Sequence, residues 1–303
     1  MDNSASHTPS TSFTLASKVK DYFLLIKFTL SFTVVFSCVV CFLLAPKNGY
    51  DWWMIIVIFM AGMLVTGSAN AINQSVEKDT DAMMKRTATR PVASGRMSQN
   101  EAYIFALITG ALGVIMMWYF FNLSSALISA FSLFLYAFIY TPLKKINSIA
   151  VLVGAFPGAL PCLIGWVAGF YNQPVVWTGG LILFGIQFLW QFPHFWAIAW
   201  VAHQDYIKAG FKLLPADKGP TKFTAVQAIM YSVLMIPVGI LPKAFGITGN
   251  ISLWIVLACN LFMVVQSVRL YKEMDVKAAR RVMFSSYIYL PIVLLALLAD
   301  KIL

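Results

Sequence analysis

Three oxygen-bearing side chains recur every four residues in one polar stretch of an otherwise apolar chain: Asn73, Glu77 and Asp81. If the preceding helix continues through them, each four-residue step turns only about 40° around the helix axis, so the three side chains lie along one stripe. Asp79 then points away from that stripe. Carboxylate and amide oxygens in a row suit Mg²⁺, which completes its shell with water and substrate phosphates.

Basic side chains follow the stripe directly. Lys85, Arg86 and Arg90 lie within MKRTATRP at 84–91, and a guanidinium can bind phosphate oxygens through two parallel hydrogen bonds. Acids and bases side by side at a membrane surface fit a metal-bridged diphosphate. The alternative is a solvated loop whose charges only pair with one another, and spacing alone does not decide between the two.

Polar residues elsewhere in the chain could join this stripe. Asp205 follows an apolar segment and could supply a further carboxylate across a central cavity. Lys27 lies in the apolar run YFLLIKFTLSF; intramembrane bases usually face a cavity and a partner, although this one is near enough to the inner end to snorkel. Tyr140 and Lys144 are four residues apart, which places them on one face of a helical turn if Pro142 permits it.

One histidine lies in an aromatic-rich apolar segment, WQFPHFWAIAW at 190–200. A buried histidine such as His194 is more often a hydrogen-bonded structural residue than a ligand, but the aromatic side chains around it could also house a large planar substrate. The four cysteines all lie in apolar segments, where they behave as small hydrophobic residues. These cysteines are Cys38, Cys41, Cys162 and Cys259.

The composition predicts that membrane-spanning helices position these residues. The 303 residues are 60% hydrophobic and 11% charged, with a mean hydropathy of +0.77, and a helix needs about 20 apolar residues to span a bilayer. The apolar runs are too long and uniform for the alternating strands of a β-barrel. We therefore predict an all-α integral membrane protein with nine spans: 22–44, 52–72, 101–121, 123–141, 149–170, 176–201, 226–246, 251–270 and 283–300.

The distribution of charge predicts the topology. If the spans alternate in direction, eighteen bases lie on one face and three on the other, which makes the crowded face cytoplasmic, with the N-terminus inside and the C-terminus outside. The net charge of +10 then reflects topology and does not indicate a nucleic-acid partner. We expect a disordered tail over 1–17, one transmembrane domain over 18–303 with long inner loops at 73–98 and 202–225, and a bacterial plasma (inner) membrane as its location.

Five short motifs in this order resemble the UbiA superfamily of intramembrane prenyltransferases, and within it the branch that acts on heme. They are the stripe at 73–81, RTATRP at 86–91, YTPLK at 140–144, PHFW at 193–196 and DYIKAGFKLLP at 205–215. The resemblance covers nearly the whole chain from Lys27 onward. It implies nine helices around a central cavity that opens laterally to lipid.

The resemblance also implies a role for each candidate residue. His194 would contact heme. The Mg²⁺ ligands would be Asn73, Glu77, Asp81 and Asp205, which with Lys144 make up the implied catalytic set. The diphosphate would be bound by Lys27, Arg86, Arg90, Tyr140 and Lys144.

Two positions depart from the superfamily pattern. Glu77 stands where aspartate is usual; it keeps the charge but adds a methylene, which allows a water-bridged contact in place of direct ligation. Ala209 stands where the second acidic motif usually has its second acid.

The implied reaction is transfer of a farnesyl group from farnesyl diphosphate to the vinyl group of protoheme IX, with Mg²⁺ as cofactor. The implied partners are these two substrates and the lipid bilayer, together with heme A synthase or terminal oxidase assembly proteins. One alternative is prenylation of an aromatic or quinone precursor, which the RTATRP and PHFW motifs disfavour. A transporter would place its polar groups nearer the bilayer midplane, and a non-catalytic heme-binding or assembly protein is the third alternative.

Overall fold

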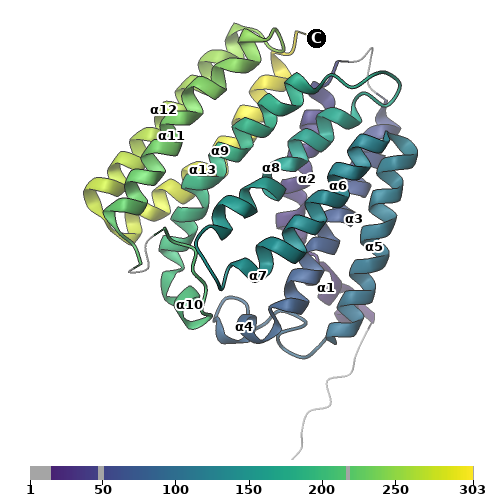
Figure 1. The fold of residues 1–303 in the computed structure, drawn as a ribbon, viewed down its shortest axis with the longest axis vertical. Helices are drawn as coiled ribbons and strands as arrows, with labels where there is room; N and C mark the ends of the chain where they lie inside the picture. The colour runs from purple at the N-terminus through teal and green to yellow at the C-terminus, as the bar shows by residue number, and fades with distance from the viewer. Residues whose placement is uncertain (1–14, 47–50, 216–218, 303) are drawn as a thin grey trace, which may run out of the picture.

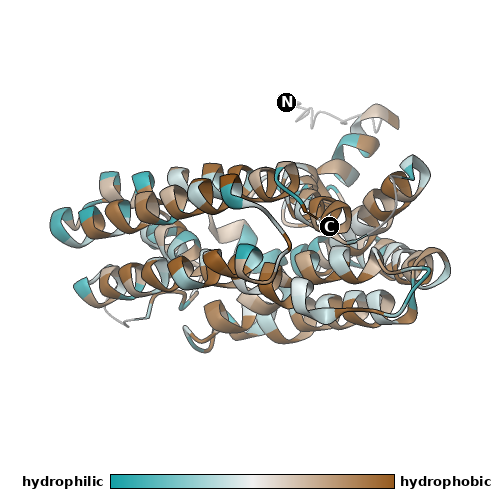
Figure 2. Cartoon of the chain, turned by 90° about the horizontal axis from the view of Figure 1, so that it is seen from above, coloured by the Kyte–Doolittle hydropathy of each residue, from teal (hydrophilic) through white to brown (hydrophobic). Residues whose placement is uncertain are grey.

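The computed structural model describes residues 15–46, 51–215 and 219–302. These residues are almost entirely helical, and the only β-structure among them is one isolated bridge between Thr248 and Lys301. The helices are mainly hydrophobic, with hydrophilic residues concentrated toward their ends and in the connections (Figure 2). The prediction of an all-α membrane protein is confirmed. The expected tail over 1–17 falls largely outside the described residues.

The helices follow one another mostly with short connections, and the longer ones come after α4 and α10 (Figure 1). In chain order they are α1 (Leu15–Leu25), α2 (Phe28–Leu44), α3 (Trp52–Val76), α4 (Lys78–Met83), α5 (Gln99–Phe120), α6 (Leu123–Phe134), the π-helix η1 (Leu135–Tyr140), α7 (Thr141–Leu143), α8 (Ala150–Ala168), α9 (Trp177–Val201), α10 (His203–Lys208), α11 (Lys222–Ala244), α12 (Asn250–Glu273) and α13 (Val276–Ala299).

The number of membrane spans agrees with the prediction of nine. Among the described residues eight helices are long and apolar enough to cross a membrane, with the segment Leu123–Leu143 counted as one. A ninth span results if α1 and α2, which meet at an angle of 51°, are taken together. The first span is therefore broken, whereas the apolar run at 22–44 predicted a continuous helix.

Capping residues fix where several helices begin. Ser98 accepts a hydrogen bond from the backbone amide of Glu101 at the start of α5, and Asp275 accepts one from Ala278 at the start of α13. Such caps stabilise a helix by about 1 kcal/mol each. The polar residues that precede the apolar runs also belong to the helices. Helix α11 therefore begins at Lys222 and α13 at Val276, not at residues 226 and 283 as predicted.

Helix α8 lies at the centre of the bundle. It packs against α2, α6 and α9, and most of its residues are buried. Helices α11, α12 and α13 lie on one side of it, beyond α9, and α3, α5 and α6 on the other (Figure 1). The thiol of Cys162 on α8 contacts the side-chain oxygen of Gln187 at 2.6 Å, and Cys38 and Cys41 are buried nearby on α2. These thiols are part of the packed core, as expected.

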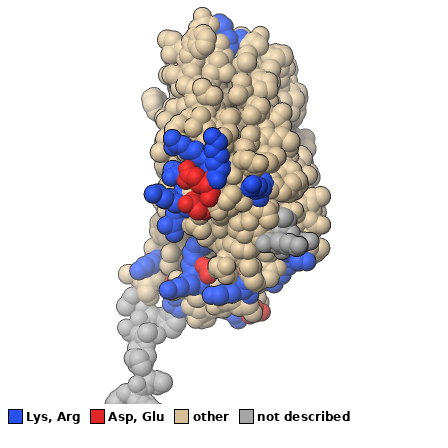
Figure 3. Space-filling model, turned by 90° about the vertical axis from the view of Figure 1, so that its left-hand side faces the viewer, with Lys and Arg blue, Asp and Glu red and all other residues tan. Residues whose placement is uncertain are grey.

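Charge is concentrated at one end of the bundle. Lys and Arg gather over the middle and lower parts of the face in Figure 3, whereas its upper third carries only a small basic group. The short helices α4 and α10 lie at this end, where Met84 packs against Ala209 and Phe211 (Figure 1). The two long segments predicted as inner loops therefore contain helical turns and contact each other. We call this end the inner end.

Candidate functional site

The stripe of oxygen-bearing side chains lies where α3 meets α4. The condition that the preceding helix continues through the stripe is met only in part, because α3 ends at Val76 and Glu77 has a non-helical backbone between the two helices. Two backbone hydrogen bonds, from the Glu77 amide to Asn73 O (3.0 Å) and from the Asp81 amide to Glu77 O (2.7 Å), nevertheless keep the four-residue repeat. Asn73, Glu77 and Asp81 are only 1%, 3% and 1% exposed, whereas Asp79 is exposed.

Each member of the stripe has a basic partner. Lys27 Nζ donates to Asn73 Oδ1 at 2.8 Å, and Lys144 forms an ion pair with Glu77. Arg90 Nη1 donates to both carboxylate oxygens of Asp81, at 2.8 and 2.7 Å. Lys27 is within electrostatic range of the other four charges. We call the six residues the charged cluster: Lys27, Asn73, Glu77, Asp81, Arg90 and Lys144.

The burial of the charged cluster argues against a purely stabilising role. It brings three bases and two acids together in a bundle that is otherwise apolar, and Glu77, Asp81 and Lys144 are at most 7% exposed. Removing such charges from water costs several kcal/mol per ion, which pairing only partly offsets. Buried charges at the end of a membrane bundle therefore indicate a functional site.

Two aromatic rings enclose the Lys144 ammonium. Its Nζ lies 4.9 Å from the centroid of Tyr140 and 5.2 Å from that of Phe211, distances at which a cation is attracted to the ring face. The Lys144 amide bonds to Tyr140 O at 3.3 Å, so the two side chains share a helical turn in spite of Pro142. Tyr140 in turn lies against α8 at Gly154, where an added Cβ would be 2.6 Å from the ring.

The segment after α9 reaches the charged cluster through residues other than the predicted one. The backbone amide of Lys212 donates to Lys144 O at 2.7 Å, beside Phe211. Asp205 is half-buried and forms no ion pair with any described residue. Over the described part of the chain no three acidic, histidine or cysteine residues form a metal-binding group, so the structure does not join Asp205 to Glu77 and Asp81.

Arg86 lies on the side of the charged cluster that faces α13. Its Nη2 is 3.5 Å from the hydroxyl of Tyr206, and its side chain does not pair with Asp81. Tyr206 is within electrostatic range of Tyr140 and, together with Arg86, of Tyr287 on α13. A row of polar and aromatic groups thus runs from the charged cluster toward α9 and α13.

His194 stands at the far end of that row. Its ring stacks on Trp190 (4.6 Å between centroids) and meets Tyr287 edge-on at 5.2 Å. Ser286 gives its hydroxyl hydrogen to Met283 O at 2.6 Å, so it accepts from His194 Nδ1 at 2.8 Å. Because Nδ1 then carries the ring proton, Nε2 retains its lone pair.

Sequence reasoning missed Thr141, Tyr206 and Phe211. Thr141 Oγ1 accepts from Asn73 Nδ2 at 3.3 Å and donates to Tyr136 O at 2.8 Å, which orients the amide so that Oδ1 faces Lys27. Thr141 and Tyr206 lie within the quoted motifs YTPLK and DYIKAGFKLLP, but nothing in the spacing distinguishes them from their neighbours. The motifs were the available signal.

The charged cluster has a donor set that fits Mg²⁺. An amide oxygen and two carboxylates share one stripe, and all are oxygen ligands. Glu77 Oε1 is buried, and its one partner among the described residues is the Lys144 ammonium, so a lone pair remains for a cation. Neither of the two hollows that we describe, one beside Ile26 and one beside Glu101, is lined by a residue of the charged cluster.

A bundle of apolar helices long enough to span a membrane, with buried acids and bases at one end, defines a polytopic membrane protein with a charged site at that end. The chain belongs to the UbiA prenyltransferase family, whose model matches residues 34–289.

Its relatives include the protoheme IX farnesyltransferase of Cytophaga hutchinsonii, which is 45% identical over 95% of this chain and 100% of that protein. The protoheme IX farnesyltransferase of Flavobacterium johnsoniae is 41% identical over 90% of this chain and 92% of that protein.

Solved structures share the fold. A structure described for digeranylgeranylglyceryl phosphate synthase superposes with a TM-score of 0.78 at 23% identity, covering 94% of this chain and 98% of that one. A UbiA homolog from Archaeoglobus fulgidus bound to GPP and Mg²⁺ superposes with a TM-score of 0.65 at 12% identity, covering 91% and 99%.

Proposed function

We propose that the chain transfers the farnesyl group of farnesyl diphosphate to a vinyl group of protoheme IX, which yields heme O. The relatives carry the choice of substrates. The structural observation that carries the reaction class is the charged cluster, in which three bases are each held against an oxygen-bearing side chain on one buried stripe. This arrangement supports binding of a metal diphosphate at the inner end of the bundle.

Both halves of the charged cluster have a part in binding. Asn73, Glu77 and Asp81 would hold Mg²⁺, which when bound neutralises negative charge on the diphosphate and so favours its departure. Lys27, Arg90 and Lys144 would bind phosphate oxygens. The bases exceed the acids by one, so a magnesium diphosphate, which is itself an anion, brings the site toward neutrality.

The chain's residues stabilise the charge that develops during the reaction. The bond between C1 of the farnesyl group and the diphosphate oxygen breaks, and the diphosphate departs with the electron pair. Lys27, Arg90 and Lys144 are already positioned where this charge accumulates, and preorganised groups of this kind are usually the largest catalytic contribution. The apolar helices around the site keep water from the allylic cation.

Bond formation completes the transfer. The terminal vinyl carbon of protoheme attacks C1 of the farnesyl group, and the positive charge moves to the carbon next to the porphyrin ring. Water adds there and releases a proton, which gives the hydroxyethylfarnesyl product. The row from Tyr206 to His194 supports a heme position beside α9 and α13, with the lone pair of His194 Nε2 available to the heme.

The same proposal includes a location. We place the protein in the bacterial inner membrane with α1 entering from the cytoplasm, because the inner end carries most of the bases. Farnesyl diphosphate would then reach the charged cluster from the side where its diphosphate is soluble.

The test is the heme composition of membranes that contain the protein. Membranes supplied with farnesyl diphosphate should convert heme B to heme O, as measured by mass spectrometry. We expect Asp81→Asn to lower the rate about 100-fold or more, since it removes charge from the stripe where diphosphate leaves. Asp79→Asn is the matched control, because Asp79 lies on the same short helix but is exposed, and it should keep wild-type activity.

Other outcomes would reject parts of the proposal. Equal rates for both variants would remove the stripe from the mechanism. A prenylated aromatic or quinone precursor without heme O would assign the other UbiA-type activity. Heme retention or substrate uptake without any prenylated product would favour a binding or transport protein.

A further inference from the structure

The first membrane span is broken at the residue that contributes a base to the charged cluster. Lys27 lies between α1 and α2 and has φ 48° and ψ 57°. This left-handed region is unfavourable for residues other than glycine, and it persists only where the surroundings impose it. The position nevertheless holds a lysine. Strain of this kind gathers at functional sites, and specific contacts must impose it here.

Side chains of α3 hold the broken turn. Gln74 Nε2 donates to two consecutive backbone carbonyls, Leu24 O at 2.9 Å and Leu25 O at 2.8 Å. Asn70, one turn earlier on α3, donates from Nδ2 to Ile26 O at 3.2 Å and to Ser31 Oγ at 3.0 Å. Carbonyls that lose their helical partners at the break thus find amide donors on the neighbouring helix.

The orientation in which Gln74 makes these bonds leaves its side-chain oxygen unpaired among the described residues. The side chain is 1% exposed, and its Oε1 has no hydrogen-bond partner among the described residues. Buried polar atoms are nearly always paired, and an unpaired one is unfavourable. A residue selected for stability alone would not be buried in this way, so the bonds to the turn need another explanation.

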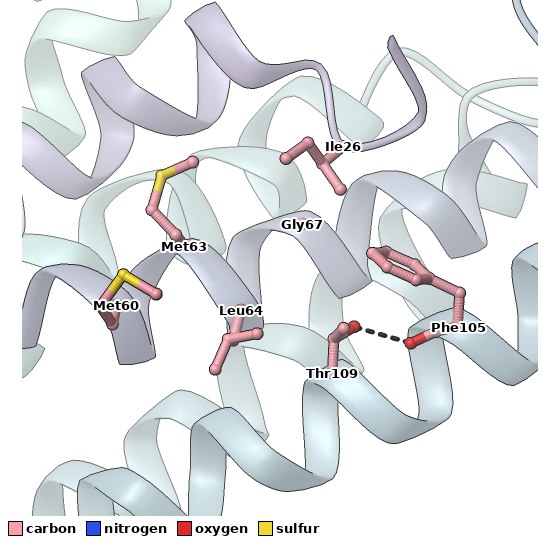
Figure 4. Close-up of a pocket in the computed structure, with 7 residues that line it drawn as sticks. All are labelled: Ile26, Met60, Met63, Leu64, Gly67, Phe105 and Thr109. Carbon is pink, nitrogen blue, oxygen red and sulfur yellow. Dashed lines mark hydrogen bonds between the residues drawn. The ribbon is translucent and has the colours of Figure 1, made fainter. Parts of the chain in front are cut away.

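Apolar packing holds one side of the turn, where Leu25 is fully buried in a cluster with Ala71 and Ala102. Ile26 borders an apolar hollow of about 110 Å³ between the turn, α3 and α5 (Figure 4). Ile26 lies over Gly67 there, and the other lining residues are Met60, Met63, Leu64, Phe105 and Thr109. Because the side of the turn at Ile26 is not fully packed, the amides of α3 add the polar contacts that hold its carbonyls.

We propose that Gln74, assisted by Asn70, is a positioning residue for Lys27. By holding the carbonyls of the broken turn, it keeps Lys27 in its left-handed conformation, from which the ammonium reaches Asn73 Oδ1 at 2.8 Å. Gln74 adjoins Asn73 in sequence, so a single turn of α3 both fixes the backbone of the lysine and receives its side chain. The identity of the anion bound by Lys27 rests on the proposed function.

A double-mutant cycle tests this assignment. We would prepare Gln74→Met, Lys27→Met, the double variant and Gln99→Met, and measure binding of magnesium inorganic diphosphate by calorimetry as well as kcat and KM for farnesyl diphosphate. Gln99 is the matched control, because its Nε2 donates to Ser75 O at 2.9 Å on the same end of α3 without touching the broken turn.

Gln74→Met should weaken magnesium diphosphate binding about tenfold or more, nearly as much as Lys27→Met, since both remove one charge-assisted contact. The double variant should bind no more weakly than Lys27→Met alone, because residues that act through one contact are not additive. Gln99→Met should bind like the wild type. If Gln74→Met does not fold, Gln74→Asn, which keeps the amide but is too short to reach both carbonyls, replaces it with the same expectation.

Additive losses in the double variant, or equal behaviour of Gln74→Met and Gln99→Met, would overturn the inference. Wild-type protein that binds magnesium diphosphate but forms no heme O would refute the proposed function and leave the cycle interpretable. Wild-type protein that does not bind magnesium diphosphate would overturn both.

Discussion

The resemblance to the superfamily motifs marks Glu77 as a departure from their pattern, and its surroundings show how a glutamate is accommodated here. It occupies the non-helical joint between α3 and α4, and its carboxylate pairs with the buried Lys144. Aspartate and glutamate carry the same negative charge at this position, and the structure shows that Lys144 is the partner of that charge. Charge should therefore matter more here than side-chain length.

Substitutions at Glu77 separate these two properties. Glu77→Asp keeps the charge and should keep kcat/KM for farnesyl diphosphate within about tenfold, since a displaced ligand can bind the metal through water. Glu77→Gln leaves Lys144 buried without its partner, which costs about 3–5 kcal/mol. We expect it to lose activity at least 100-fold and to unfold at lower temperature. If Glu77→Gln were the more active of the two, the charge of this residue would have no part in the site.

The segment from α6 to the residue directly after α7 supplies both Thr141 and Lys144. Its last turns before Thr141 form the π-helix η1, and such turns often mark functional sites. The ring of Tyr140 lies at the end of η1 and packs on α8 where Gly154 leaves room for it. The position of Lys144 therefore depends on the contact between Tyr140 at the end of η1 and Gly154 on α8.

Gly154→Ala tests this contact. The new Cβ would be 2.6 Å from the Tyr140 ring, and overpacking of this kind costs about 1–3 kcal/mol, which outweighs the higher helix propensity of alanine. Both kcat/KM and the unfolding temperature should fall.

Gly185→Ala is the control, because its Cβ would lie 3.5 Å from Val238, an ordinary contact. It should leave activity unchanged. A fully active Gly154→Ala protein would show that the position of Tyr140 does not govern Lys144.

The sequence predicts these elements unevenly. Long apolar runs give the number of spans correctly because hydrophobic length is a local property. They do not give the break at Lys27, since this depends on amides of Asn70 and Gln74 that belong to another helix. The four-residue repeat predicts the stripe, but the contacts of Phe211 and Lys212 with Lys144 need the two inner segments to meet in space.

For the whole molecule, the asymmetric distribution of bases predicts the orientation in the membrane. Two exposed positions can report it. Lys145 lies between α7 and α8 at the inner end, and Phe245 lies between α11 and α12 at the other, with its side chain 58% exposed. Cysteine introduced at each position would be labelled with a membrane-impermeant maleimide in a Cys259→Ser background, since the other three cysteines are buried.

The protein with Phe245→Cys should be labelled in intact spheroplasts. The protein with Lys145→Cys should react only after the membrane is permeabilised. The reverse pattern would place the charged cluster on the outer face and would contradict both the orientation and the supply of farnesyl diphosphate from the cytoplasm.

The pairing of every acid of the charged cluster with its own base has a consequence for selectivity. A divalent cation that arrives alone must displace a lysine or arginine from its carboxylate, and a diphosphate that arrives alone must draw a base away from its acid. Only the two together give each displaced group a new partner. We therefore expect metal and diphosphate each to raise the affinity of the site for the other by the same factor. Free cytoplasmic phosphate, or free metal alone, should occupy the site only weakly.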